Sequence, residues 1–286
     1  MNPSPLRYPG GKYKLYPYVE QLIQINNCST YIEPFCGGAA IAIQLLISNK
    51  VENVIINDYD YSIYCFWDSV INNTELFVKK IEETNINVDE WMIQKKIHDE
   101  YQDCSYSSLD IGFSTFFLNR TNRSGIISKA GPIGGYTQDG HYKIDCRFNK
   151  EKLIEQIEII GALSKRIKVF SYEALDFVDN VILKTRNSLV FFDPPYYKKG
   201  PVLYQNFYSH GDHNNLAYVI THSLKNRKWI VTYDNVDSIK SMYPNISRIE
   251  FALNYSLQKK RKGTEVLFFS KKVVRPFNED RYLCLI

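Results

Sequence analysis

Residues 30–58 read TYIEPFCGGAAIAIQLLISNKVENVIIND, and this stretch decides the fold. An apolar run at 30–35 leads through two glycines into an apolar helical run at 39–48. A second strand-like run follows at 53–58 and ends in an acid. A strand, a glycine turn, a helix and a strand closed by an acid are typical of a nucleotide-binding βαβ unit. The stretch therefore predicts an α/β fold with a ligand site at the glycine turn.

Outward from this unit, the pattern of the chain changes twice. Helical patterns dominate residues 61–166, with a polar, glycine-rich stretch at 123–147 whose turn residues favour a hairpin. Alternation of strands and helices then resumes, and the last two strands follow one another without a helix, which predicts an antiparallel pair. We therefore predict one α/β domain from residues 1–60 and 167–286, interrupted by a helical insertion at 61–166. The expected helices are 15–25, 39–48, 61–72, 75–84, 88–101, 109–120 and 150–163, and the later strands are 168–172, 189–193, 229–233, 249–255 and 266–270.

The strand at 189–193 runs into Asp193-Pro194-Pro195-Tyr196, at the end of a strand where α/β sheets bind ligands. The two prolines fix the backbone and remove two N–H donors. Two acceptors remain beside the Tyr196 ring, namely the Asp193 carboxylate and the Pro194 carbonyl. An exocyclic amine offers two N–H donors and a flat ring, so we predict Asp193, Pro194 and Tyr196 as catalytic residues. Taken alone, the motif has a plain structural alternative, a proline-rich turn with a buried Asp.

The glycine turn carries two acids in informative places. Glu33 precedes Gly37 and Gly38, where it could meet a cationic group such as the ammonium of an amino acid. Asp58 ends the second strand, the position that hydrogen-bonds a ribose diol in such folds. A turn or helix-capping role is the alternative for Asp58. The glycines do not form G-x-G-x-x-G, so no pyrophosphate site is implied.

In this order, the motifs resemble the Dam-like DNA adenine methyltransferases, which carry a glycine motif, a target-recognition insertion and then DPPY. The resemblance spans essentially the whole chain and includes RYPGGK at 7–12 and LNRTNRSG at 118–125. It implies an α/β, class I S-adenosylmethionine-dependent methyltransferase (Rossmann-like) sheet with an antiparallel last strand and an inserted helical DNA-binding domain. The cofactor-binding residues that it implies are Tyr8, Lys12, Glu33, Phe35, Gly37, Asp58, Asp176, Phe177 and Asp193.

The insertion is expected to choose the DNA sequence, because the catalytic strands carry chemistry common to any adenine. Arg reads guanine, and Asn or Gln reads adenine, through paired hydrogen bonds to base edges. The polar stretch and the helix before it supply donors and acceptors of these kinds. The predicted DNA-binding residues are Asn119, Arg120, Asn122, Arg123, Lys129, Tyr136 and Gln138.

The resemblance implies transfer of a methyl group from S-adenosylmethionine to the exocyclic N6 amine of adenine in double-stranded DNA. Base flipping and direct in-line transfer are expected, in a restriction-modification setting, although the sequence leaves open whether a restriction enzyme accompanies the protein or it is a solitary methylase. One alternative is methylation of a cytosine, RNA or protein amine, since DPPY-like acceptors serve several amines. Another is an inactive, cofactor-binding DNA module, although a binder has no need of the Asp193 acceptor. The absence of a Pro-Cys motif argues against methylation of a cytosine ring carbon.

Bulk properties narrow the class of protein. The chain has 286 residues and is 44% hydrophobic, which suits one large α/β domain with an insertion, and its net charge of +4 permits nucleic-acid binding. The six cysteines are scattered, and His210 and His213 lack a third ligand at matching spacing, so we expect no metal and a loop or helix start at HGDH. With neither a signal peptide nor a membrane-length apolar run, a cytoplasmic protein without a membrane partner is expected. The oligomeric state is left open, with a monomer allowed.

Overall fold

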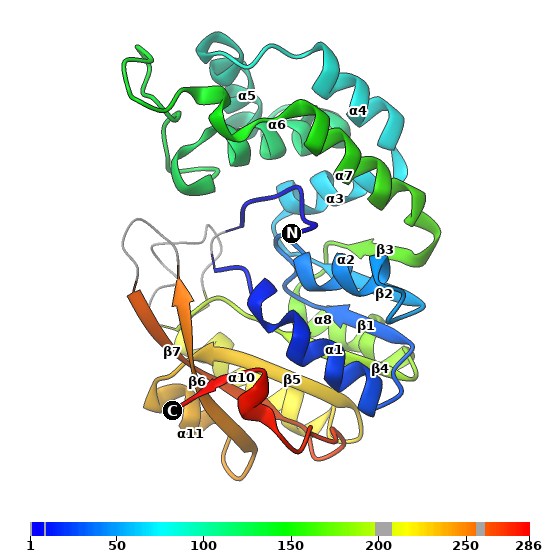
Figure 1. Ribbon diagram of the computed structural model, residues 1–286. Helices are drawn as coiled ribbons and strands as arrows, with labels where there is room; N and C mark the ends of the chain where they lie inside the picture. Colours follow the sequence, from blue (N-terminus) through cyan, green and yellow to red (C-terminus); the bar gives the residue numbers. More distant parts are fainter. Residues whose placement is uncertain (1, 9, 198–207, 256–260) are drawn as a thin grey trace. The chain divides into compact units, whose positions relative to one another are not determined.

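The computed structural model describes residues 2–8, 10–197, 208–255 and 261–286. The chain forms two compact units (Figure 1). The first unit comprises Met1–Gly11 and Asp60–Ser171, and the second comprises Lys12–Tyr59 and Tyr172–Ile286. Each unit is assembled from two separate stretches of sequence. Asp60–Ser171 of the helical unit is inserted into the sheet unit, whereas Met1–Gly11 precedes the sheet unit in the sequence.

The second unit is built on a mixed sheet whose strands run in the order β2-β1-β4-β5-β7-β6-β8. Pairing is parallel from β2 to β5 and antiparallel from β5 onward. The antiparallel pair expected at the end of the chain is therefore confirmed. The strands are β1 (Thr30–Glu33), β2 (Asn53–Asn57), β4 (Ser188–Phe192), β5 (Lys228–Asp234), β6 (Ser247–Tyr255), β7 (Arg261–Phe269) and β8 (Cys284–Leu285).

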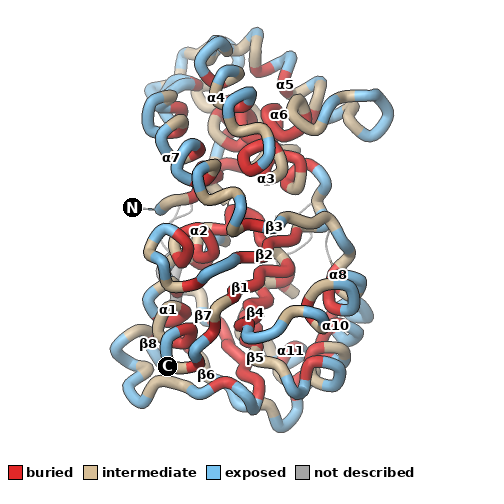
Figure 2. Tube along the Cα trace, turned by 90° about the vertical axis from the view of Figure 1, so that its right-hand side faces the viewer, coloured by how far each residue is buried: buried red, intermediate tan, exposed pale blue. Residues whose placement is uncertain are grey.

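Helices cover both faces of this sheet. Figure 2 shows α1 and α2 on one side of the buried strands, and α8, α10 and α11 on the other. Strands β1 and β4 are buried at every residue, which explains why both read as continuous apolar runs rather than as alternating ones. The helices are α1 (Tyr16–Ile25), α2 (Ala40–Ile47), α8 (Ala174–Asn180), α10 (His210–His222) and α11 (Asp237–Met242), with short 3-10 turns at Tyr13–Leu15, Ile182–Lys184 and Glu279–Arg281.

The first unit is helical and has an aromatic core. Its main contact joins α3 to α6, where Gly112 lies so close to α3 that an added Cβ would come within 2.5 Å of the Cys65 carbonyl. Phe66 and Phe116 stack across this contact at 5.9 Å between ring centroids. The helices are α3 (Tyr61–Asn72), α4 (Thr74–Glu83), α5 (Val88–Glu100), α6 (Ser108–Thr121) and α7 (Lys150–Ala162), with 3-10 turns at Arg123–Gly125, Ile144–Arg147 and Ser164–Arg166 and the strand β3 (Ile167–Phe170).

The division of the chain differs from the predicted one in two places. The prediction gave residues 1–60 and 167–286 to the sheet domain, whereas residues 1–11 and 167–171 belong to the helical unit. The cause at the N-terminus is Asn119 on α6. Its side-chain oxygen accepts from Arg7 N at 2.7 Å and its amide donates to Arg7 O at 3.3 Å. At the other boundary, β3 packs against α3.

The hairpin expected at 123–147 is not formed. This segment contains turns, the two 3-10 turns and one isolated bridge between Asn122 and Pro132. Gly134 and Gly135 take positive φ values of 86° and 79°, which bend the chain out of an extended course. The Gln138 side chain supplies bonds that a strand partner would otherwise give, since it binds Ile133 O, Gly135 O and Ile144 N. The segment is a loop held by a side chain.

Candidate active site

The DPPY motif lies at the centre of the sheet of the second unit. Asp193 follows directly after β4, which pairs with β1 on one side and β5 on the other. Strand β2 lies beyond β1, so the order of the parallel strands reverses at the β1–β4 boundary. Crevices at the carboxyl ends of strands, where such a reversal occurs, are the ligand sites of open α/β sheets.

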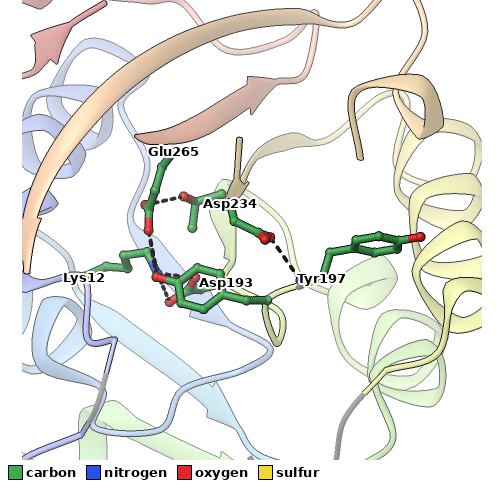
Figure 3. A network of polar contacts seen from close by, with 7 residues as sticks. Lys12, Asp193, Tyr197, Asp234 and Glu265 are labelled. Atoms are coloured by element: carbon green, nitrogen blue, oxygen red, sulfur yellow. Dashed lines mark hydrogen bonds and ion pairs between the residues drawn. The ribbon is translucent and has the colours of Figure 1, made fainter. Parts of the chain in front are cut away.

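Lys12 contacts Asp193, Tyr196 and Glu265. Figure 3 shows the side chains of Lys12, Asp193 and Glu265 close together. Its ammonium Nζ lies 2.8 Å from Asp193 Oδ1 and 3.1 Å from Asp193 Oδ2. The same Nζ is 3.0 Å from Tyr196 Oη and 3.7 Å from Glu265 Oε1. The side chain of Lys12 is 4% exposed, whereas that of Asp193 is 25% exposed. Asp193 therefore remains open to a ligand, while Lys12 is held beneath it.

Burial raises the pKa of Asp193 to about 6, and the negative charge of Glu265 acts in the same direction. Lys12 opposes both effects through its positive charge and its hydrogen bond. The carboxyl of Asp193 is thus ionised at pH 7 but only one unit away from its midpoint. A carboxyl with a pKa this close to neutrality can accept a hydrogen bond as an anion and can also take up a proton.

Tyr196 is fixed by its hydroxyl. Oη donates to Glu265 Oε1 at 2.7 Å, and the Lys12 ammonium lies 4.7 Å from the centre of the ring. The residue is buried. The next residue is also tied down, because Tyr197 N donates to Asp234 Oδ1 at 3.0 Å. These bonds fix the backbone that presents Asp193 and the Pro194 carbonyl.

The glycine turn and the end of β2 are joined by Asp58. Its carboxylate accepts from Gly37 N at 2.8 Å, and Cys36 N donates to Asn57 O at 2.9 Å. Gly37 has φ 43° and Ala39 has φ 43°, so the chain turns sharply before α2 begins. The turn therefore places the predicted cofactor residues Gly37 and Asp58 in direct contact.

Glu33 is an acid buried at the end of β1. Burial raises its pKa to about 8, the negative charge of Asp193 adds to this effect, and Tyr31 and the backbone of Ala42 oppose it. Within the described residues, Glu33 forms no ion pair with a Lys, Arg or His. A buried carboxyl of this kind is costly to ionise unless a cation arrives with a ligand. This is the chemistry expected of a residue that meets an amino-acid ammonium.

The remaining predicted cofactor residues lie in three different settings. Phe35 is half-buried and meets the Tyr208 ring edge to face at 5.8 Å between centroids. Asp176 is exposed in the first turn of α8, whereas Phe177 is completely buried beneath it and presents no surface to a ligand. Tyr8 is half-buried in the first unit. The role of each in cofactor binding stays a prediction.

Three of the seven predicted DNA-binding residues hold the helical unit together. Asn119 is fully buried between Arg7 and Gly125. Asn122 is also fully buried, accepts from Trp91 Nε1 at 2.6 Å and donates to the carbonyls of Ile126 and Ile127. The Gln138 side chain forms its hydrogen bonds with the backbone of its own loop. In this conformation the three amides are bonded within the unit, so their predicted contact with DNA bases gains no support from their placement.

The other four predicted residues are accessible or cationic. Arg123 and Lys129 are exposed, and Tyr136 is exposed over 62% of its surface beside the Trp91 ring. Arg120 is half-buried, and its Nε is buried without a hydrogen-bond partner. The pKa of Arg120 is lowered to about 10, mainly by burial and also by the positive charges of Arg7 and Arg147.

Arg7, Arg120 and Arg147 form an arginine cluster in the first unit. Burial is the main cause that lowers the pKa of Arg7, followed by the charge of Arg147. No ion pair links any of the three to an acid within the described residues. Guanidinium groups that repel one another without a carboxylate partner are suited to an anion such as phosphate.

Sequence reasoning missed several polar residues of the site. Glu265 opens the apolar run TEVLFF, and a lone acid at the start of a buried strand is the signal that could have found it. Thr232 donates to Glu265 Oε2 at 3.2 Å, and Asp234 holds Tyr197. Nothing in their local sequence distinguishes Thr232 and Asp234 from ordinary strand residues.

His210 and His213 begin α10, as expected for a helix start. Ser209 and Asp212 form a capping box there, and His213 Nδ1 lies 3.0 Å from Tyr233 Oη. Across the ranges that the structure describes, no group of three or more His, Cys, Asp or Glu side chains could hold a metal ion. In the same ranges, no helix has both the length and the apolar character needed to cross a membrane.

The parallel strands with an antiparallel β7, together with acids at the ends of β1, β2 and β4, define a class I S-adenosylmethionine-dependent methyltransferase fold. Residues 8–257 match the D12 class N6 adenine-specific DNA methyltransferase family, and the chain belongs to that family. The resemblance to adenine methyltransferases is thereby confirmed. Membership makes the protein an adenine-specific methyltransferase and implies S-adenosylmethionine as methyl donor and DNA as substrate.

Three relatives are similar to this chain. The Type II methyltransferase M.MjaIII of Methanocaldococcus jannaschii is 26% identical over 207 residues, 67% of this chain and 68% of its own. The modification methylase StsI of Streptococcus sanguinis is 25% identical over 205 residues, which are 68% of this chain but only 28% of StsI. The Type II methyltransferase M.CviBI of Paramecium bursaria Chlorella virus NC1A is 22% identical over 267 residues, 91% of this chain and 95% of its own.

Proposed function

We propose that this protein methylates the N6 amine of an adenine that is flipped out of double-stranded DNA, by direct in-line transfer. The observation that carries the proposal is the placement of the Asp193 carboxylate, 25% exposed, at the β1–β4 reversal of the sheet. A base within a duplex cannot reach such an acceptor, so the target has to leave the stack.

The amine is recognised by its two N–H donors. Asp193 and the Pro194 carbonyl accept from them, and this orients the nitrogen lone pair toward the methyl group. The bonds of Tyr196 to Lys12 and Glu265 keep the DPPY backbone rigid, and the Tyr196 ring is proposed to stack on the base. Catalysis is then mainly positioning and electrostatics. The N6 proton is lost after transfer, and Asp193, with a pKa near 6, can hold it briefly before water takes it.

The chemistry of the acids fits S-adenosylmethionine. The cofactor supplies a methyl group bonded to a positive sulfur. Buried Glu33 fits the ammonium of its amino-acid part, and Asp58, held beside the glycine turn by Gly37 N, fits the ribose hydroxyls. Phe35, Asp176, Tyr8 and Lys12 complete the proposed set by family resemblance, whereas Phe177, which has no exposed surface, is proposed only to pack beneath Asp176.

DNA is bound by the helical unit. The arginine cluster (Arg7, Arg120 and Arg147) is proposed to contact phosphates. Phosphate contacts contribute to the affinity for DNA but not to sequence specificity. Exposed Arg123, Lys129 and Tyr136 are proposed to lie nearest the bases. Exchange of residues 123–147 for the matching segment of a relative tests this, because the methylated sequence should change while activity persists. An unchanged site preference would refute the assignment.

A restriction-modification role is proposed because the named relatives are Type II methyltransferases and a modification methylase. The test is single-molecule sequencing of DNA from a methylation-deficient host that expresses the chain. N6-methyladenine should occur at one short sequence motif and should vanish in cells that express Asp193→Asn. Methylcytosine at a motif, or no modified base despite soluble protein, would refute the proposed function.

A further inference from the structure

Glu265 on β7 is a buried acid that stands beside the proposed acceptor, and it is 2% exposed. Its Oε1 accepts from Tyr196 Oη at 2.7 Å, and its Oε2 accepts from Thr232 Oγ1 at 3.2 Å. Both carboxylate oxygens are therefore fixed by hydroxyl donors. The charge of the group faces the Lys12 ammonium, 3.7 Å from Oε1 (Figure 3).

Lys12 lies between two acids, and only one of them is open to a ligand. Its Nζ contacts both oxygens of Asp193, at 2.8 Å and 3.1 Å. A substrate amine needs one of those oxygens as its acceptor, so the ammonium and the amine compete for it. Glu265 offers Lys12 a second counter-charge at a distance that a small movement of Nζ can close.

We propose that Glu265 is a positioning residue, which holds the Lys12 ammonium when the substrate amine binds and so frees Asp193 to accept the amine hydrogen. The inference rests on the acceptor role proposed for Asp193. Without the charge of Glu265, Lys12 would keep Asp193 as its acid partner, and the substrate amine would have to break that ion pair. Breaking a buried ion pair is costly, so turnover should fall.

Several groups determine the electrostatic environment of the Asp193 carboxyl. Lys12 comes from the segment before the first 3-10 turn, Glu33 from β1, Tyr196 from the loop after β4 and Glu265 from β7. On β5, Thr232 donates to Glu265, and Asp234 accepts from Tyr197 N. On β6, Phe251 is the strand partner of Glu265. Glu265 raises the pKa of Asp193 and Lys12 lowers it. Removal of the Glu265 charge should therefore lower the pKa of Asp193 below about 6.

The experiment is an NMR titration of the full chain with 13C-labelled aspartate carboxyls, in which the Asp193 signal is assigned by its absence from Asp193→Asn. In Glu265→Gln the titration midpoint of Asp193 should move to lower pH by at least half a unit. Glutamine keeps a carbonyl for the Tyr196 hydroxyl and removes only the charge. The kcat should fall roughly tenfold, and the acidic limb of its pH profile should move to lower pH. Thr232→Val is the matched control, because it removes one bond to Glu265 without a change of charge and should leave the midpoint in place.

Two outcomes would overturn the inference. One is an unchanged Asp193 midpoint in Glu265→Gln. The other is an equal loss of kcat at every pH, with the same loss when Glu265→Gln is added to Lys12→Met, because an effect through Lys12 disappears in that background. Turnover retained in Asp193→Asn would instead refute the proposed acceptor, whatever the midpoint shows.

Discussion

Cofactor binding should depend on pH through Glu33, and Glu33→Gln is the change that reveals it. Burial raises the pKa of this carboxyl to about 8 in the free protein, so near neutrality it is mostly protonated. An ammonium group binds the ionised form, so binding must expel the proton. The affinity for S-adenosylmethionine should therefore rise with pH up to the free-protein pKa.

The size of the effect follows from the ionised fraction. With a pKa of about 8, roughly 1% of Glu33 is ionised at pH 6 and roughly 9% at pH 7. The Kd should fall roughly ninefold across that interval, which corresponds to about 1.3 kcal/mol. The amine of an amino acid titrates near pH 8, so the ligand itself stays largely charged in this window. On binding at pH 7, Glu33 should release roughly 0.9 proton and the ligand amine should take up roughly 0.1, so the net release is roughly 0.8 proton.

Calorimetry at pH 6 and pH 7, in buffers that differ in ionisation enthalpy, gives both the Kd and the number of released protons. Glu33→Gln should bind more weakly at pH 7, with nearly the same Kd at pH 6 and pH 7 and no proton release. Asp193→Asn removes the neighbouring group that titrates near pH 6 and should keep most of the pH dependence. A wild-type Kd that changes less than threefold, or an equal change in Glu33→Gln, would refute the assignment of Glu33 to the ammonium.

Four further predictions concern single side chains. Asp193→Asn should lower kcat by roughly a thousandfold or more (about 4 kcal/mol) in a methyl-transfer assay with cofactor binding retained, and a loss below tenfold would exclude Asp193 as the acceptor. Asp58→Ala should weaken cofactor binding by calorimetry, since it removes the acceptor proposed for the ribose, and an unchanged Kd would contradict that role. Asn119→Ala should lower the free energy of unfolding by about 2–3 kcal/mol in urea titration, because Arg7 N, Arg7 O and Gly125 O lose their partner; an effect below 0.5 kcal/mol would show that water replaces the amide. Arg147→Gln should weaken binding to all DNA sequences alike and reduce the slope of log K against log salt by about 1, whereas a sequence-dependent loss would point to base reading.

The placement of the acids in the second unit could be predicted from the sequence because it depends on short, local segments. Glu33, Asp58 and Asp193 each end an apolar strand, and parallel strands bring their carboxyl ends to the same edge. Rigid prolines and the glycine turn mark the same places. Glu265 has no such signal, because it acts across the antiparallel ladder from residues far away in sequence.

The helical unit was harder to predict at the level of single residues. Asn119, Asn122 and Gln138 look like base readers by residue type, yet their amides bind the backbone of Arg7 and of neighbouring loop residues. A polar residue in a loop-rich segment can serve either purpose, and only the burial of its side chain decides between them. The hairpin expected at 123–147 was wrong for a similar reason, because glycine-rich turns occur both in hairpins and in compact loops.

The sequence by itself determined the sheet, the antiparallel end and the acids at the strand ends, because hydrophobic period and turn residues act over a few positions. Tertiary structure alone decided which unit the N-terminal residues join, which polar side chains are exposed, and which partners Lys12 has. These depend on contacts between residues more than a hundred positions apart, such as Arg7 with Asn119 and Lys12 with Asp193. Such contacts cannot be predicted from local sequence, because the sequence around each residue is compatible with other partners. The partner is determined only when the chain packs.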